Sequence, residues 1–376
     1  MTANVLRVAL DMRPTSEPGT GIARYARELA EKLVLENDLD VHLLYKFKTK
    51  DRKIARASVK HAPQMNWLQG FVPRYCKEHA VHVFHGTNFV VPLMTRMHRV
   101  VTVHDMTLFS IRSGHRLRTL LVHGIQSLLS LTVADAVITD SRATANALGA
   151  RFPWLRTRIH HVPLGVDASF VPTVGTVMNS NTEKRNIDPP FVLNVGKQEP
   201  RKNLPLLIEG FARACQWSQW VHDLVLVGPD GSASRDVRQA VRDSGVENRI
   251  HLLGVVADAE LVSLYHRASL VIYPSSVEGF GLPVLEAMAC GVPVVTLSDP
   301  SVLEVTGGAA LVLPSATPEA VAHALQSGVT IGPERDERIR LGLTRAASYR
   351  WEYVAAATLN VYREVAHRRP RFGQSS

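Results

Sequence analysis

Short apolar runs alternate with longer amphipathic segments along most of the chain. The runs are rich in Val, Ile and Leu and stand between turn-forming residues, a pattern typical of strands that are buried on both faces of a parallel sheet. The segments between many of them have helical spacing, and this alternation predicts an α/β protein built on parallel sheets. We expect strands at residues 5–10, 41–45, 81–84, 100–103, 136–139, 159–163, 191–195, 224–228, 250–254, 270–273 and from 293.

The length of the chain and the placement of its turn-rich segments predict two domains. With 376 residues, the chain suits two domains of ordinary size. We expect a Rossmann-like domain at residues 1–167, a linker at 168–190 rich in Pro, Asn, Thr and Ser, and a second Rossmann-like domain at 191–350. A helix at 351–367, apolar on one face, and a polar tail at 368–376 follow.

Neither a membrane span nor a secretion signal is visible in the sequence. There is no apolar run of about 18 residues, and the N-terminus lacks a charged segment followed by an apolar one. The three cysteines, Cys76, Cys215 and Cys290, do not have the spacing of metal ligands and are expected to be reduced thiols. We therefore expect a cytoplasmic protein, or one at the inner face of the plasma membrane.

The formal charge of +9 is concentrated in the first half of the chain. Residues 1–180 contain 23 Lys and Arg against 13 Asp and Glu, whereas the remainder contains 20 against 21. A basic half favours an anionic partner, such as nucleic acid, an acidic membrane or a phosphorylated acceptor, although it can also serve solubility alone. The basic run 46–60, followed by Trp67 and Phe71, suits a peripheral membrane contact or, equally, a solvated loop before a packed helix.

The stretch 273–295 carries the strongest chemical signal. It predicts the end of a strand, a turn, a helix from Leu282 and a further buried strand. Pro283 is tolerated in the first helical turn, and Gly291 provides a left-handed residue at the end of the helix. Ligands collect at the carboxyl ends of parallel strands, where helix N-termini present free N–H groups.

Two carboxylates, Glu278 and Glu286, lie in this stretch eight positions apart. Each could be a solvated residue near a helix. The helix is otherwise apolar, however, so Glu286 is expected to need a buried partner. Gly279 and Gly281 leave room for backbone N–H groups around Phe280 to approach a bound molecule.

Residues 274–295 resemble the E-x7-E signature of glycosyltransferase family 4, whose members are retaining enzymes with the two-domain GT-B architecture. The resemblance implies two Rossmann-like domains that face each other across a cleft. It also implies that Glu278 faces the donor sugar and that Glu286 holds the ribose of the nucleotide. The donor would contact the loop between them at Gly279, Phe280, Gly281 and Leu282.

Further positions match the family in the first half of the chain. Gly21 corresponds to a glycine loop over the donor phosphate and sugar. His104 corresponds to a histidine that reaches the donor sugar hydroxyls, and Asp105 beside it is a candidate for binding the sugar acceptor. The glycine loop that contains Gly21 also matches part of the NAD-binding fingerprint. Arg24, however, stands where that fingerprint has a glycine, and Lys46 stands where it has an acid.

A basic pair, Arg201 and Lys202, stands between a strand and a helix. A forked guanidinium, an ammonium and free backbone N–H groups suit a diphosphate, and the family has the same pair at the donor phosphates. Two cations offset the charge of the leaving group, so we expect no metal and no other cofactor. The resemblance also places the nucleobase near Gly254 and Val255, and we interpret the D-x-D motif at 38–40 as a solvated turn.

The opening D-x-R and G-T-G-I-A-R-Y motifs and the E-G-F-G-L-P loop look most like bacterial family 4 mannosyltransferases of surface-polysaccharide assembly. GDP-mannose is therefore the first expected donor and a lipid-linked oligosaccharide the expected acceptor, with UDP-glucose and UDP-N-acetylglucosamine as alternative donors. A nucleotide-sugar epimerase on the same architecture remains a second hypothesis. A nucleic-acid-binding protein is disfavoured, because no such module is recognisable and aromatic residues make up only 6% of the chain.

Overall fold

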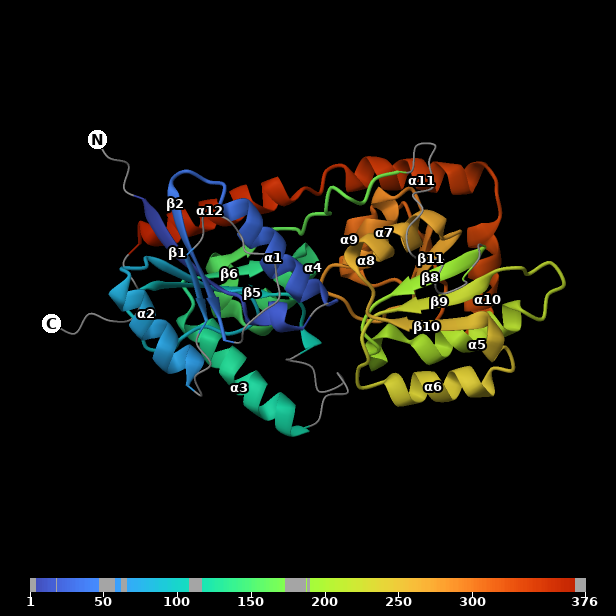
Figure 1. The fold of residues 1–376 in the computed structure, drawn as a ribbon, viewed down its shortest axis with the longest axis horizontal. Coiled ribbons are helices and arrows are strands. Elements are labelled where there is room, and N and C mark those ends of the chain that lie inside the picture. The colour runs from blue at the N-terminus through green and yellow to red at the C-terminus, as the bar shows by residue number, and fades with distance from the viewer. Residues whose placement is uncertain are drawn as a thin grey trace. The chain divides into compact units, whose positions relative to one another are not determined.

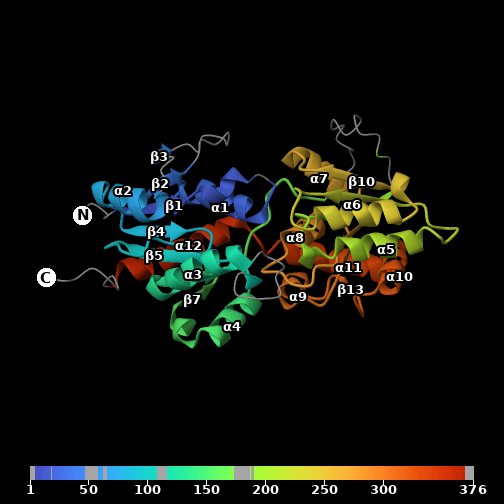
Figure 2. The ribbon, with the colours of Figure 1, turned by 90° about the horizontal axis from the view of Figure 1, so that it is seen from below.

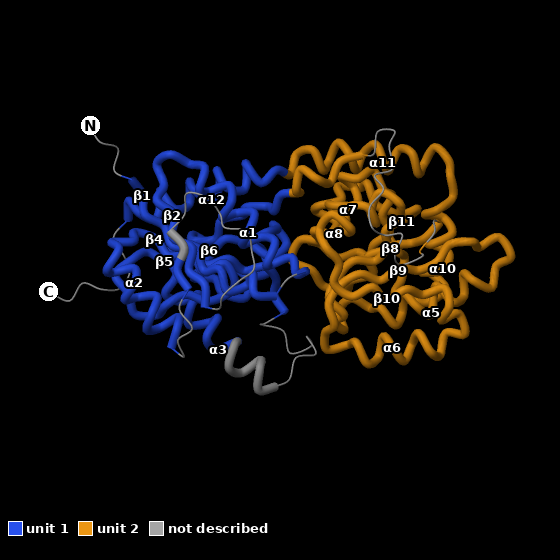
Figure 3. Tube along the Cα trace, in the orientation of Figure 1, with its two compact units in different colours: residues 1–165, 350–376 blue, residues 166–349 orange. Residues whose placement is uncertain are grey.

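The computed structural model describes residues 5–17, 19–46, 58–61, 66–107, 117–172, 187 and 190–368, with only the backbone at 58–59 and 117–123. The chain divides into two compact units, residues 1–165 with 350–376 and residues 166–349 (Figure 3). The predicted domain boundary at residue 167 lies beside this division. Most of the predicted linker 168–190 lies outside the described residues, as do residues 369–376 of the predicted tail and residues 47–57 of the basic run 46–60.

The first unit contains a wholly parallel sheet, which has seven strands in the described residues and the order β3-β2-β1-β4-β5-β6-β7 (Figures 1 and 2). The strands are β1 (Leu6–Asp11), β2 (Leu39–Tyr45), β3 (Ser58–His61), β4 (Val83–Gly86), β5 (His98–Val103), β6 (Ala136–Thr139) and β7 (Ile159–His161). Its helices are α1 (Gly21–Leu33), α2 (Val72–Glu78), α3 (Leu117–Val133), α4 (Arg142–Arg151) and α12 (Trp351–Ala366).

The C-terminal helix α12 belongs to the first unit, where it packs against α1. A buried chain of hydrogen bonds ties it to the sheet, because the Tyr362 hydroxyl lies 2.6 Å from His85 Nδ1 and His85 Nε2 lies 2.8 Å from Thr102 Oγ1. The hydroxyl of Tyr25 on α1 meets the same Thr102 oxygen at 2.9 Å. Burial lowers the pKa of His85 to about 3, so this histidine is neutral and can only link these groups as a hydrogen-bonding residue.

The second unit has its own parallel sheet, with six strands in the described residues and the order β10-β9-β8-β11-β12-β13. The strands are β8 (Phe191–Val195), β9 (Asp223–Val227), β10 (Ile250–Gly254), β11 (Leu270–Tyr273), β12 (Val294–Thr296) and β13 (Leu311–Val312). The helices are α5 (Leu204–Ala214), α6 (Ser234–Asp243), α7 (Asp258–Arg267), α8 (Leu282–Ala289), α9 (Pro300–Thr306), α10 (Pro318–Val329) and α11 (Pro333–Ala346). Helices α5, α6 and α10 form one packed group, and α8, α9 and α11 form another.

The predicted fold class, two Rossmann-like parallel sheets, is confirmed, and most predicted strands agree with the observed ones within two residues. The short edge strands β3 and β13 were not predicted. At the start of α7, Ala257 is the N-cap and Asp258 is the first helical residue. An acidic side chain in the first helical turn is stabilised by the positive end of the helix dipole. Among the described helices, none is both long and apolar enough to cross a bilayer.

Candidate active site

Two loops meet at the carboxyl end of the second sheet, one after β8 and one after β11. In the first, residues Pro200–Lys202 form a single 3₁₀ turn, and Asn203 then adopts a left-handed conformation (φ 51°) before α5. The side chain of Asn203 donates to the carbonyl of Pro274 at 2.8 Å, and the backbone N–H of Ser276 donates to the carbonyl of Arg201 at 2.9 Å. These contacts hold the basic loop against the loop that carries Glu278.

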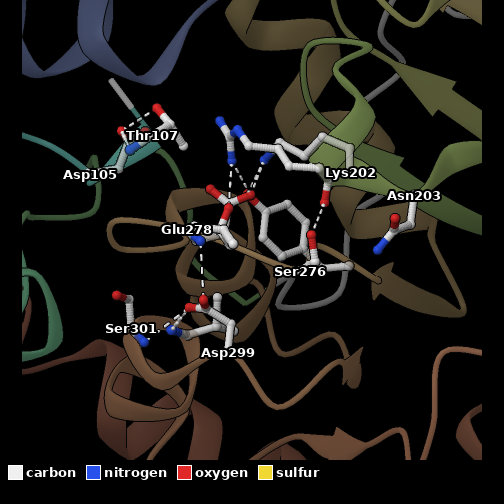
Figure 4. A network of polar contacts seen from close by, with 12 residues as sticks. Asp105, Thr107, Lys202, Asn203, Ser276, Glu278, Asp299 and Ser301 are labelled. Atoms are coloured by element: carbon white, nitrogen blue, oxygen red, sulfur yellow. Dashed lines mark hydrogen bonds and ion pairs between the residues drawn. The ribbon is translucent and has the colours of Figure 1, made fainter. Parts of the chain in front are cut away.

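Glu278 forms ion pairs with both predicted phosphate-binding residues (Figure 4). Its Oε1 lies 2.5 Å from Nη1 of Arg201 and 2.6 Å from Nζ of Lys202. The side chains of Glu278 and Lys202 are buried, whereas that of Arg201 is 28% exposed. Residues that are 76 and 77 positions apart in the chain thus form one compact group of two cations and one anion.

The carboxylate of Glu278 is a permanent anion in this setting. Burial alone would raise its pKa, but Lys202 and Arg201 outweigh that effect and lower the pKa to about 2. The ammonium of Lys202 also donates to the hydroxyl of Tyr273 and lies 4.3 Å from the centre of its ring. Glu278 therefore cannot act as a proton donor near neutral pH, and a bound diphosphate would compete with it for the same two cations.

A residue that the sequence analysis did not identify, Asp299, supports the Glu278 loop (Figure 4). Its Oδ2 accepts the backbone N–H of Glu278 at 3.1 Å, while its Oδ1 accepts those of Ser301 and Val302 at 3.0 Å each. Asp299 is thereby the N-cap of α9. The sequence signal was present, since an Asp before Pro300 is typical of a helix start, but its bond to Glu278 depends on the tertiary fold.

Glu286 is buried on α8 and lies in a different hydrogen-bonding group from Glu278. The partner that an apolar helix requires is Tyr265 of α7, whose hydroxyl donates to Oε2 of Glu286 at 2.8 Å. The tyrosine ring packs edge-on against Phe170, with 5.6 Å between the ring centres. This hydrogen bond holds the carboxylate of Glu286 in one orientation. A fixed carboxylate is suited to accept hydrogen bonds from the hydroxyl groups of a ligand.

The loop between the two acids contains one glycine with positive φ. Gly281 has φ 104° and precedes α8, and a Cβ there would lie 3.3 Å from Val302. The side chains of Phe280 and Leu282 are buried, with the Phe280 ring edge-on to Tyr349. At the end of β10, Gly254 has φ 66°, and an added Cβ there would meet open space. The next residue, Val255, is exposed.

In the first unit, the predicted site residues follow β1 and β5, two strands that β4 separates in the sheet. Gly21 is the first residue of α1, after the N-cap Thr20. His104 follows β5, and its Nδ1 lies 2.6 Å from Oδ2 of Asp140, which follows β6. Asp105 closes a turn by accepting the backbone N–H of Thr107 at 2.9 Å (Figure 4). Sequence reasoning missed Asp140, because the residue before the helix-capping Ser141 gave no signal of its own.

The solvated turn predicted for the D-x-D motif is confirmed only for Asp38, which lies in a turn with its side chain 43% exposed, whereas Leu39 and Asp40 begin β2. Asp38 pairs with Arg363 of α12 at 2.5 Å, and Asp40 lies 3.4 Å from Nε2 of His42. Arg363 reaches this position only because α12 packs on the first unit, which the local sequence could not indicate. Within the described ranges, no cluster of three or more His, Cys, Asp or Glu side chains could hold a metal ion.

Comparison with known proteins identifies the families that the two halves of the chain match. Residues 19–170 match the family model for glycosyltransferase family 4, and residues 178–341 match that for the group 1 glycosyl transferases. The chain is a glycosyltransferase. It is 28% identical to the O-antigen chain mannosyltransferase B of Escherichia coli, over 95% of this chain and 100% of that protein.

Two further relatives extend the comparison. A D-inositol 3-phosphate glycosyltransferase of Kineococcus radiotolerans is 30% identical over 63% of this chain and 58% of its own length. The solved structure of HepE from Anabaena, in complex with UDP and glucose, superposes with a TM-score of 0.76 at 16% identity and covers 96% of this chain and 100% of that one. The second likeness shows a shared fold, the two-domain GT-B architecture.

We expect the exchange Glu286→Gln to weaken binding of the free nucleotide by about tenfold to a hundredfold, since a hydrogen bond to a charged group contributes about 1.5–3 kcal/mol. The family resemblance places Glu286 at the ribose of the nucleotide, away from the bond that reacts. We therefore expect the rate at saturating donor to change much less. Calorimetric titration with nucleotide measures the first effect. Glu319→Gln, on the exposed surface of α10, is the matched control. Equal affinities for both variants would contradict the ribose assignment.

Proposed function

We propose that this glycosyltransferase transfers mannose from GDP-mannose, with retention of configuration, to a saccharide acceptor in bacterial surface-polysaccharide synthesis. The group formed by Arg201, Lys202 and Glu278 carries the proposal, because it places two cations and one permanent anion at the carboxyl end of a nucleotide-binding sheet. Likeness to the E. coli O-antigen mannosyltransferase over almost the whole chain supports mannose and a lipopolysaccharide-type product.

In the proposed reaction, the diphosphate of the donor lies against Arg201 and Lys202. Their charges offset the negative charge that develops on the leaving group, so the reaction needs no metal ion. Glu278 orients the sugar and stabilises positive charge at its anomeric carbon. A second carboxylate beside Glu278 in the described residues, Asp299, accepts three backbone N–H groups and is not an obvious nucleophile, which favours attack on the face that the diphosphate leaves. The leaving phosphate then takes the proton of the acceptor hydroxyl.

The acceptor side of the proposal concerns the first unit. Asp105 would bind the acceptor sugar, and His104 would lie beside the donor sugar. A lipid-linked oligosaccharide is the proposed acceptor, which would bring the protein to the cytoplasmic face of the plasma membrane. The excess of Lys and Arg over Asp and Glu in residues 1–180 suits a peripheral contact with anionic lipids there.

Titration with GDP and with UDP, in the presence of a metal chelator, tests the donor. We expect GDP to bind at least about tenfold more tightly, a preference of about 1.4 kcal/mol, and GDP-mannose to be consumed when acceptor is added. The chelator should leave both results unchanged. Tighter binding of UDP would overturn the mannosyl donor in favour of UDP-glucose or UDP-N-acetylglucosamine. Binding that requires a divalent cation would overturn the metal-free mechanism.

A further inference from the structure

Three neighbouring strands of the first sheet, β4, β5 and β6, end at a buried histidine. Nδ1 of His104 lies 2.6 Å from Oδ2 of Asp140, and its Nε2 lies 2.9 Å from the carbonyl oxygen of Thr87. All three residues are buried. Each ring nitrogen of His104 therefore faces an oxygen at hydrogen-bond distance, and each oxygen comes from the end of a different element.

The two partners determine how many protons the group must hold. A backbone carbonyl has no hydrogen to give, so Nε2 of His104 must carry one. An ionised Asp140 is likewise an acceptor only, so the 2.6 Å contact requires a second proton between Nδ1 and Oδ2. A neutral imidazole beside a carboxylate would leave one of the two contacts without a hydrogen.

The surroundings favour an imidazolium beside a carboxylate. Burial lowers the pKa of His104, but Asp140, the Thr87 carbonyl and Asp105 together outweigh burial and raise it. The ring of Tyr25 on α1 meets His104 edge-on at 5.0 Å, and His85 of β4, which is neutral, adds no competing charge. Burial raises the pKa of Asp140, and Asp105 adds to this rise, while His104 and His161 of β7 oppose it, so that the proton stays within the pair.

The second carboxylate oxygen of Asp140 also indicates that His104 is the main partner of this side chain. Oδ1 is buried and has no hydrogen-bond partner among the described residues. The carboxylate thus depends on His104 for its charge balance. Asp135, at the other end of β6, has different partners, since its Oδ2 accepts the backbone N–H of Arg99 at 2.8 Å and lies 3.8 Å from Nε of the same arginine.

We propose that Asp140 is a positioning residue that keeps His104 protonated on both ring nitrogens, so that His104 serves the transfer as a fixed cation and not as a base. The pair shares one proton, and the bond from Nε2 to Thr87 holds the ring in place. Once that proton is lost at high pH, one of the two contacts breaks and the ring is released. The link to catalysis rests on the proposed place of His104 beside the donor sugar.

The protonation state can be measured without any substrate. In ¹⁵N-labelled protein, the His104 imidazole, assigned by comparison with His104→Asn, should have a hydrogen on both nitrogens at pH 7.5. That is about one unit above the ordinary pKa of histidine. Asp140→Asn should convert it to a neutral ring, whereas Asp135→Asn should leave it doubly protonated. A neutral His104 in the wild-type protein at pH 7.5 would overturn the proposal, whatever the variants do.

The pH dependence of transfer tests the role in the reaction. Asp140→Asn should lower kcat by at least about tenfold at pH 7.5 and move its alkaline decline to lower pH by about one unit or more, with little change in KM for the donor. Asp135→Asn should keep the wild-type profile. An equal loss of kcat in both variants without a shift of the profile would reduce Asp140 to a structural residue. A wrong donor sugar would abolish transfer in every variant but leave the imidazole spectra as expected, which separates the two failures.

Discussion

The exchange Glu278→Gln is expected to lower kcat for sugar transfer by a factor of about 10²–10³, the loss that follows removal of one preorganised electrostatic group. Glu278 is the permanent anion of the site, with a pKa of about 2, and a neutral amide of the same size cannot stabilise positive charge on the sugar. Binding of the free nucleotide should be unchanged or tighter, because Arg201 and Lys202 are then released for the diphosphate. Steady-state kinetics with donor and acceptor, and calorimetry with nucleotide, measure the two effects separately.

The test distinguishes a catalytic role from a folding defect, because kcat is expected to fall while nucleotide affinity does not. A variant that simply unfolds the loop would lose transfer and nucleotide binding together, which would contradict the proposed arrangement. Glu209→Gln on α5 is the matched control, because Glu209 is an exposed Glu that pairs with Arg213 in the same unit. Its exchange removes a surface ion pair of small energetic value and should change neither quantity.

The exchange Lys202→Met is expected to weaken binding of a nucleoside diphosphate by about tenfold to a hundredfold, because it removes one charge-assisted hydrogen bond of about 1.5–3 kcal/mol. Methionine keeps most of the volume of the buried side chain, so packing against Tyr273 is largely retained. Affinity for the corresponding nucleoside without phosphates should stay the same. Titration of wild type and variant with both ligands isolates the phosphate contribution.

A matched control comes from α5, where Arg213→Met removes an exposed cation in the same unit. It should leave both affinities as in wild type. If Lys202→Met weakened the nucleoside and the diphosphate equally, the ammonium would act through folding and not through phosphate contact. If it weakened neither, the diphosphate would have to bind away from the group that contains Glu278.

Local sequence determined the elements of this protein and the positions of its functional loops. Apolar runs at the expected spacing became parallel strands, because strands covered on both faces need a side chain that avoids water at every position. The cap of α4 is local in this sense, because Ser141 accepts the backbone N–H of Thr144, only three residues later. The turn around Gly281 and the start of α8 at Leu282 are local in the same sense.

Only the tertiary structure decided how the functional residues are paired. The Glu278 carboxylate meets cations from a loop more than 70 positions earlier, and Glu286 meets Tyr265 of another helix. The Asp140–His104 pair and the contact of Asp38 with Arg363 of α12 likewise join separate elements. Such pairs form where parallel strands end next to each other, or where a helix from a distant part of the chain packs on the sheet. The spacing of residues along the chain does not show which elements become neighbours in this way. The charge state of each group depends on these pairings and therefore could not be predicted from the sequence alone.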